Sequence, residues 1–284
     1  MTRRDAQQIV KVMRRHVLLS TATSLCLLGV VVLGSLAASL QAVSPQRTQS
    51  LWTAATFAGM AWVILTVLSA KQIKSANQAA AYLSAGRLDL AEQELTTALN
   101  SFSLYRMGKL MVCHNLAVVV HGQKNYQAAA ELCDGIISLH RGVGKSLGRV
   151  CRILLADCRL FLGDTLAALK ALQPLVRNRE GLSLAEQLML LPIELRAQIA
   201  EGQFAQAAAD LPAKVRRAEL LDSPRAALVH ALLSRACRQM GDALRADFLL
   251  RRAQLYHDLS DLREDYPLLK DSLDAAKIAD SIKG

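Results

Sequence analysis

The chain has 284 residues, of which 52% are hydrophobic and only 4% aromatic, and its formal net charge at pH 7 is +10. This composition favours aliphatic, alanine-rich helices. The charge is concentrated at the amino-terminal end, where residues 1–74 carry a single acidic residue, Asp5, and eight basic ones: Arg3, Arg4, Lys11, Arg14, Arg15, Arg47, Lys71 and Lys74. Because residues 75–284 are nearly neutral, they lack the clustered cations that drive phosphate binding, and we exclude a nucleic-acid partner.

Two long uncharged runs follow a basic leader of residues 1–16. The first run spans residues 17–43, which as a helix would be about 40 Å long and would exceed the thickness of a bilayer core. The second spans residues 51–70, close to the minimum crossing length of about 20 residues. Residues 44–50 between them are mostly polar and contain Pro45, so they predict a short turn. A cleaved signal peptide is the alternative for the first run, although signal h-regions have only about 7–15 residues.

The pattern therefore predicts a transmembrane helical hairpin in an integral membrane protein with two spans. Basic residues in the short segments next to membrane spans accumulate on the cytoplasmic side. Both termini and the rest of the chain are therefore predicted to be cytoplasmic. Helices in lipid approach closely through small residues. Two such pairs are the candidate packing seam, within the hairpin or in a homo-oligomer: Gly34, Ala38, Ala55 and Gly59.

Residues 75–256 contain a repeated pattern. Alanines recur at intervals of 38, 39, 39 and 39 residues, at Ala91, Ala129, Ala168, Ala207 and Ala246. Five residues before them stand Gly86, Lys124, Gly163, Gly202 and Gly241, and four residues after them stand Leu95, Cys133, Leu172, Leu211 and Leu250. This register predicts five units, each a helix, a tight turn and a second helix that packs closely through its alanine. The expected fold is all-α, an α-solenoid of about five helix pairs.

The repeats resemble the tetratricopeptide repeat. Its small position in the first helix is matched by Ala79, Ala117, Ala156 and Ser234, with Leu195 as an exception, and its aromatic slot by Tyr82. The period is about five residues longer than the usual 34, and the family's Trp and terminal Pro are missing, so HEAT-like helix pairs remain the structural alternative. Ser183 and Glu186 predict a capping box at one helix start. Residues 257–284, which alternate charged and apolar residues, are predicted to form a capping helix.

The resemblance implies a peptide-binding groove lined by the first helix of each pair. On this mapping, the candidate groove residues are His114, His121, Asp157, Arg196, Arg235 and Arg238. Three arginines on one wall could hold an acidic peptide through charge-assisted hydrogen bonds, or could simply be solvated or paired within the chain.

Sites for chemistry are not indicated. No phosphate loop, dinucleotide, zincin or nucleophile-elbow motif occurs. The six cysteines include no C-x-x-C pair, and Cys113 and His114, being adjacent, would point about 100° apart on a helix. We therefore expect no enzyme, no catalytic residue, no metal and no cofactor.

The predicted function is a membrane-anchored scaffold or adaptor that binds protein partners or peptides. The alternative is an accessory subunit of a membrane enzyme or transporter whose hairpin packs against partner spans.

Overall fold

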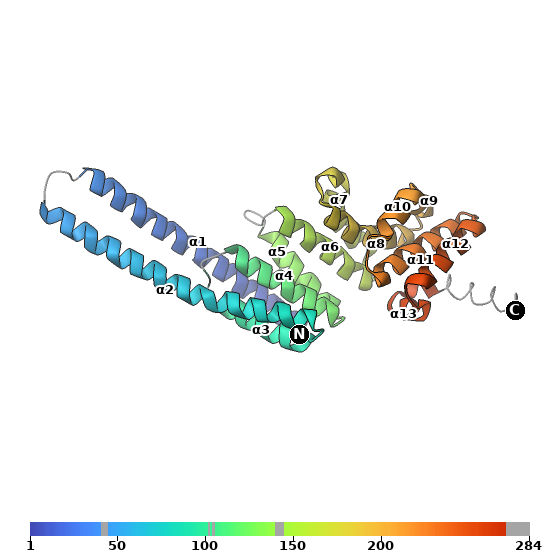
Figure 1. Cartoon of the computed structure of the whole chain (residues 1–284), viewed down its shortest axis with the longest axis horizontal. Coiled ribbons are helices and arrows are strands. Elements are labelled where there is room, and N and C mark those ends of the chain that lie inside the picture. Colours follow the sequence, from blue (N-terminus) through green and yellow to red (C-terminus); the bar gives the residue numbers. More distant parts are fainter. Residues whose placement is uncertain (41–44, 102, 104–105, 140–144, 271–284) are drawn as a thin grey trace. The chain divides into compact units, whose positions relative to one another are not determined.

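The computed structural model describes residues 1–40, 45–101, 103, 106–139 and 145–270 (Figure 1). Over these residues every regular element is a helix, which confirms the all-α prediction. The chain divides into two compact units, Met1–Leu154 and Leu155–Gly284. The first contains α1 (Arg3–Leu40), α2 (Pro45–Ser84), α3 (Leu88–Asn100), α4 (Arg106–Gly122) and α5 (Tyr126–Ser138), and α6 (Lys145–Phe161) runs across the boundary. The second contains α7 (Thr165–Arg177), η1 (Arg179–Gly181), α8 (Leu184–Ala200), α9 (Phe204–Ala208), α10 (Leu211–Ala218), α11 (Ser223–Gln239), α12 (Ala243–Tyr256), α13 (Leu259–Asp265) and η2 (Pro267–Leu269).

The basic leader belongs to α1 and is packed against α5. Arg3 Nε lies 2.8 Å from Glu131 Oε1, and Arg14 Nη2 donates a 2.7 Å hydrogen bond to Ser138 Oγ. The apolar face of the same helix is buried through Ala6, Met13 and Val17. Residues that looked like a free cationic flank are thus partly a packing surface for the first unit.

Replacing Gly135 by alanine is expected to weaken this packing. A Cβ at Gly135 would lie 2.5 Å from Val10 Cγ2, so α1 must shift, at a cost of about 1–3 kcal/mol in the free energy of unfolding. Urea denaturation followed by circular dichroism measures the loss. The double variant Gly135→Ala/Val10→Ala should recover most of it, and an equal loss in both variants would contradict the contact.

Helix α2 is continuous from Pro45, whose fixed φ suits a first helical position, to Ser84. The predicted turn at residues 44–50 therefore mostly belongs to α2, while residues 41–44 lie outside the described residues. The predicted second span, residues 51–70, and the first helix of the repeats form one element. Any movement of the apolar part of α2 is consequently coupled directly to the first helix pair.

The prediction of two membrane spans is wrong. Among the described residues, one segment, Thr56–Ser84 of α2, is long and apolar enough to cross a membrane. The run at residues 17–43 extends beyond the described residues at 41–43. It begins with Val17 and Ser20 buried in the protein, and Thr21 and Thr23 hydrogen-bond to backbone carbonyls of their own helix. The localisation as a two-span integral membrane protein with cytoplasmic termini is corrected accordingly.

Five tight turns join the helices at the positions that the repeat register marked. The backbone φ is positive at Gly86 (71°), Lys124 (61°), Gly163 (77°), Gly202 (71°) and Gly241 (83°). Each turn carries the same hydrogen-bond pair as at Gly86, where Arg87 N donates to Tyr82 O and Gly86 N to Leu83 O. This is the Schellman termination of a helix. All five register alanines are fully buried. The chain thus has a helical repeat-like fold.

Lys124 occupies the one turn in which glycine is replaced. A side chain at positive φ costs roughly 1 kcal/mol in the left-handed region, so Lys124→Gly is expected to stabilise the first unit by about 0.5–1 kcal/mol. Thermal unfolding should show a raised midpoint. Gly163→Lys offers the reciprocal change at an equivalent turn, and it should destabilise by a similar amount; an effect of the same sign in both variants would contradict the interpretation.

The fourth pair departs from the register in its second helix. Asp210 has a φ of 51° and separates α9 from α10, and Pro212 lies in the first turn of α10. Leu211, the expected packing residue, is consequently only partly buried against the core. The capping box predicted at Ser183 and Glu186 is confirmed at the start of α8.

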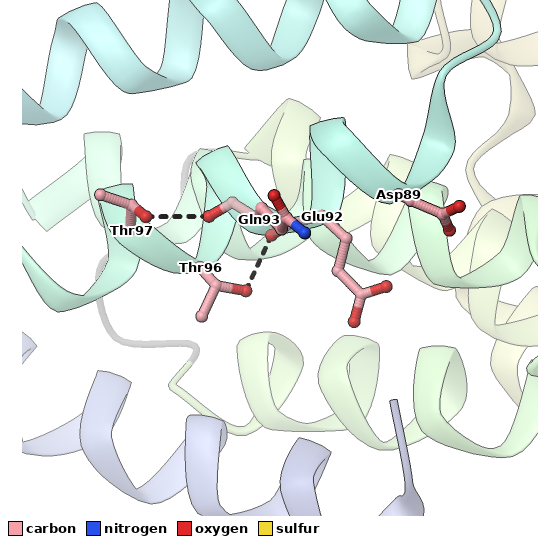
Figure 2. A pocket seen from close by; sticks show the side chains of 5 residues that line it. All are labelled: Asp89, Glu92, Gln93, Thr96 and Thr97. Carbon is pink, nitrogen blue, oxygen red and sulfur yellow. Dashed lines mark hydrogen bonds between the residues drawn. The ribbon is translucent and has the colours of Figure 1, made fainter.

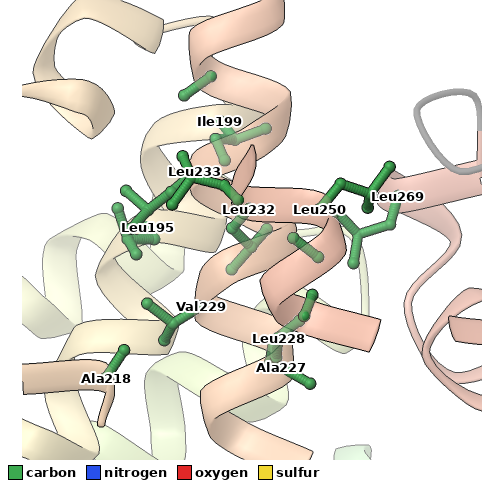
Figure 3. Close-up of a cluster of buried hydrophobic side chains, with 14 of the residues drawn as sticks. Leu195, Ile199, Ala218, Ala227, Leu228, Val229, Leu232, Leu233, Leu250 and Leu269 are labelled. Carbon is green, nitrogen blue, oxygen red and sulfur yellow. The ribbon is translucent and has the colours of Figure 1, made fainter. Parts of the chain in front are cut away.

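The core of the second unit is built around α11. Figure 3 shows Leu195 and Ile199 of α8 lying beside Leu232 and Leu233 of α11, and Leu250 of α12 completes the same cluster. Leu269, at the end of η2, is fully buried in this cluster too. The predicted capping helix at residues 257–284 therefore takes another form over its described part: the short helix α13, a break at Pro267, and η2.

Candidate functional site

The first helices of successive pairs carry equivalent positions 39 residues apart. Val118 in α4 corresponds to Asp157 in α6, Arg196 in α8 and Arg235 in α11. The last three belong to the second unit, and together with Phe161, one turn after Asp157, they define what we call the Arg196 face.

Arg196 is the centre of this face. Its side chain is 7% exposed, and its Nη1 forms an ion pair with Asp157 Oδ1, a carboxylate that is 17% exposed. The guanidinium carbon lies 4.2 Å from the centre of the Phe161 ring and 4.9 Å from that of Tyr266. Because this largely desolvated guanidinium pairs with a carboxylate and contacts two aromatic rings, Arg196 has one defined orientation.

Tyr266 reaches this face from the carboxy-terminal segment, which we define as Asp258–Leu269. Its ring lies 5.7 Å from that of Phe161 at an interplanar angle of 34°. The segment is fixed further by Leu262 and Leu269, which are 3% and 0% exposed within the core around α11. The Arg196 face is thus covered by a segment of the same chain.

The other two predicted arginines differ from each other. Arg238 Nη2 lies 2.6 Å from Asp247 Oδ1, so its charge is paired within the chain. Arg235 has Nε and Nη1 excluded from solvent, and in the described part of the chain neither atom has a hydrogen-bond partner. Guanidinium nitrogens that are shielded from water without an acceptor are costly, and a carboxylate that reached them would relieve that cost.

The predicted groove histidines lie in the first unit and meet different partners. His121 packs edge-on against Tyr126, with ring centres 5.2 Å apart. His114 Nδ1 lies 3.5 Å from the Sγ atom of Cys151, a residue of α6. The predicted Asp and Arg residues belong to the second unit.

Cys151 belongs to a group of buried thiols, and its contact with His114 was not predicted from the sequence. A hydrogen bond with the Cys133 thiol and a second one with His114 lower the pKa of Cys151 to about 6, whereas burial raises the pKa of Cys113. Cys151 and His114 are 37 residues apart, two short of the repeat period, and this is the signal that could have paired them. All three thiols are fully buried, which favours a packing role because reactive cysteines are usually accessible. Within the described residues no group of three ligands could hold a metal ion.

Lys109 is a structural cation in the same unit. It is 1% exposed, and its Nζ donates to the carbonyl oxygens of Ala98, Leu99 and Ser101 at the end of α3. Burial lowers its pKa to about 8. A helix end normally leaves carbonyls without partners, and Lys109 satisfies three of them.

The structure describes only part of the predicted packing seam. Gly34, Ala38 and Ala55 are helical, and only their backbone is described. Gly59 is exposed, and a Cβ built on it would meet nothing within 4 Å. Among the described residues, Gly59 therefore makes no close helix approach.

A shallow hollow of about 550 Å³ lies along α3, lined by Asp89, Glu92, Gln93, Thr96 and Thr97 (Figure 2). The two threonine hydroxyls donate to the carbonyl oxygens of Glu92 and Gln93 on their own helix. Gln123 donates a 2.8 Å hydrogen bond to Glu92. The hollow is thus lined by groups that are already engaged, and it offers neither a nucleophile nor an acid–base pair.

No family model matches this chain, and no curated protein or solved structure matches it either. Over its described residues, the chain defines an all-helical protein with a helical repeat-like fold and one candidate apolar helix.

Proposed function

We propose that this protein is a scaffold of tetratricopeptide-like helix pairs that binds a short segment of a partner protein on the Arg196 face. The proposal rests on the observation that a segment of the same chain already covers that face. A peptide-sized segment, Asp258–Leu269, is held there through a ring on Arg196 and through buried leucines. A surface that accommodates an apolar and aromatic segment of its own chain has the chemistry to bind a similar segment of another protein.

Repeat geometry supports this reading. Five turns of one type at a nearly constant period generate first helices whose equivalent positions follow one another, and such arrays present extended binding surfaces. The glycine at the turn and the alanine five residues later favour tetratricopeptide-like pairs over HEAT-like ones. The unpaired guanidinium atoms of Arg235 favour a partner that contributes a carboxylate.

The apolar part of α2 supplies an attachment to a membrane in this proposal. Its large side chains are exposed to between 50% and 65%: Phe57, Met60, Trp62, Val63, Ile64 and Val67. Exposed apolar surface of this extent usually meets lipid or another protein. Because α2 continues into the first helix pair, attachment would hold the repeats close to the membrane and raise the local concentration of the bound partner.

An accessory subunit of a membrane enzyme or transporter is the second candidate. It is favoured by exposed leucines on α1, namely Leu18, Leu19, Leu25 and Leu28, which could pack against spans of a partner. Gly59→Leu separates the two functions. A leucine at this exposed position would disturb packing between α2 and a partner span, whereas a peptide bound on the Arg196 face would be retained.

The test of the scaffold function is site-specific photo-crosslinking in cells. A photoreactive residue at Leu160, beside Asp157 and Phe161 on α6, should crosslink a discrete partner protein. The matched control is Leu255 on α12, which is 85% exposed and lies on a second helix. Arg235→Glu should abolish the crosslink from Leu160. Equal crosslinking from both positions, or none from Leu160, would exclude binding at this face.

A further inference from the structure

The carboxy-terminal segment has the residue spacing of a peptide ligand. Leu262, Tyr266 and Leu269 stand at positions i, i+4 and i+7, with Leu262 in α13, Tyr266 directly after its end and Leu269 in η2. Asp258 starts the segment by accepting a hydrogen bond from Ser260 N at 2.8 Å, and Tyr266 N donates to Leu262 O at 2.9 Å. The anchors are thus displayed by a short folded turn.

The anchors of the segment differ in how firmly they are held. Leu262 and Leu269 enter the core around α11, whereas the Tyr266 ring remains partly exposed on Arg196 and Phe161. Tyr266 is therefore the anchor that can be removed with the least damage to the core, and it is the one in direct contact with the Arg196 face.

Charge complements this arrangement. Asp258–Leu269 contains four acidic residues, Asp258, Asp261, Glu264 and Asp265, against the single cation Arg263. On the Arg196 face and its neighbour on α11, Arg196 pairs with Asp157 and Arg238 pairs with Asp247, whereas two guanidinium nitrogens of Arg235 have no partner among the described residues. An acidic segment beside Arg235 is favoured by complementary charge, which also disfavours basic competitors.

From these observations we propose that Asp258–Leu269 is a resident ligand of the Arg196 face, and that the partner is an acidic peptide with the same spacing of leucine, aromatic residue and leucine. The inference rests on the proposed scaffold function and names its substrate class. A tethered segment acts at an effective concentration in the millimolar range, so it competes with any free peptide. The partner binds by displacing it, and the segment sets the threshold for binding.

The experiment measures binding of a fluorescent synthetic peptide with the sequence of residues 257–270 to the full-length protein, by fluorescence anisotropy. Tyr266→Ala weakens the resident segment and should tighten peptide binding at least tenfold relative to the unmodified protein. An amide analogue, with Asn or Gln at the four acidic positions, should bind at least tenfold more weakly to the same variant. Arg196→Lys in the Tyr266→Ala background keeps the cation but loses the planar stacking, and should also weaken binding.

Circular dichroism and thermal unfolding check that Tyr266→Ala is folded, and Leu269→Ala serves as a second releasing variant. Equal affinity of the peptide for the released and unmodified proteins would overturn the resident-ligand proposal, and so would equal affinity of the amide analogue. If the Leu160 crosslink persists in either case, the scaffold function stands and only this inference fails. Loss of both the crosslink and peptide binding would reject the scaffold function itself.

Discussion

Replacing Arg196 by alanine is expected to lower the free energy of unfolding by about 3 kcal/mol, because it removes the guanidinium that pairs with the half-buried Asp157 carboxylate. The variant also removes the cation that contacts both the Phe161 and the Tyr266 ring. Urea denaturation of the full-length protein, followed by far-UV circular dichroism, measures the change. The second unit should unfold at a lower urea concentration than in the unmodified protein.

The double variant Asp157→Leu/Arg196→Met is the matched control. It replaces the pair by apolar groups of similar size, and such replacements are often neutral or stabilising when a buried pair is removed completely. We expect it to recover most of the stability lost in Arg196→Ala. A double variant as unstable as the single one would mean that the ion pair itself does not explain the loss.

Acidification is expected to destabilise the second unit through His230. This residue of α11 is fully buried, and its ring stacks on Tyr256 with centres 5.5 Å apart. Burial, together with the nearby Arg252, lowers its pKa to about 4. In the unfolded chain the pKa is about 6.5, so between these two values the unfolded state binds the proton and the folded state does not. The contribution to stability is complete above pH 6.5 and is lost as the pH falls towards 4.

The size of this effect follows from the pKa difference. By pH 4.5 the unmodified protein should have lost roughly 2–3 kcal/mol through this residue alone. His230→Phe, which keeps a stacked ring but has no titrating group, should show a correspondingly smaller loss between pH 7 and 4.5. Denaturation curves at both pH values measure the difference between the two proteins. Identical acid sensitivity would show that His230 does not govern it.

The repeat register is the part of the fold that could be predicted most fully. Gly86, Gly163, Gly202 and Gly241 mark positive-φ turns because glycine alone adopts them without strain, and their spacing extended the prediction to Lys124. The buried alanines follow for the same reason, since a small side chain is required where two helices approach closely. These features are local, so the sequence carries them directly.

The membrane prediction shows where local patterns were insufficient. The absence of charge over residues 17–43 was taken as a span, yet Val17 and Ser20 are buried by protein. Lys109 presents the converse case, because a lysine would normally be assigned to the surface, and only the carbonyl oxygens at the end of α3 make its burial favourable.

The candidate site required tertiary structure in a similar way. Asp157 and Arg196 could be placed on one face from their 39-residue separation, although their pairing could not be established by it. Tyr266 could not be assigned to this face at all, because the fold of a short, proline-broken segment depends on what surface it meets. The alanine register did not predict the contact between Cys151 and His114 either, because their separation differs from the repeat period.

The sequence by itself determined that the chain is helical, where its helix pairs turn and which alanines are buried, because these depend on backbone conformation and side-chain size within one repeat. The tertiary structure decided the docking of the leader on α5, the fusion of α2 with the first helix pair, and the covering of Arg196 by Tyr266. Each of these depends on contacts between residues far apart in the chain, and their free energies arise only when distant elements are brought together.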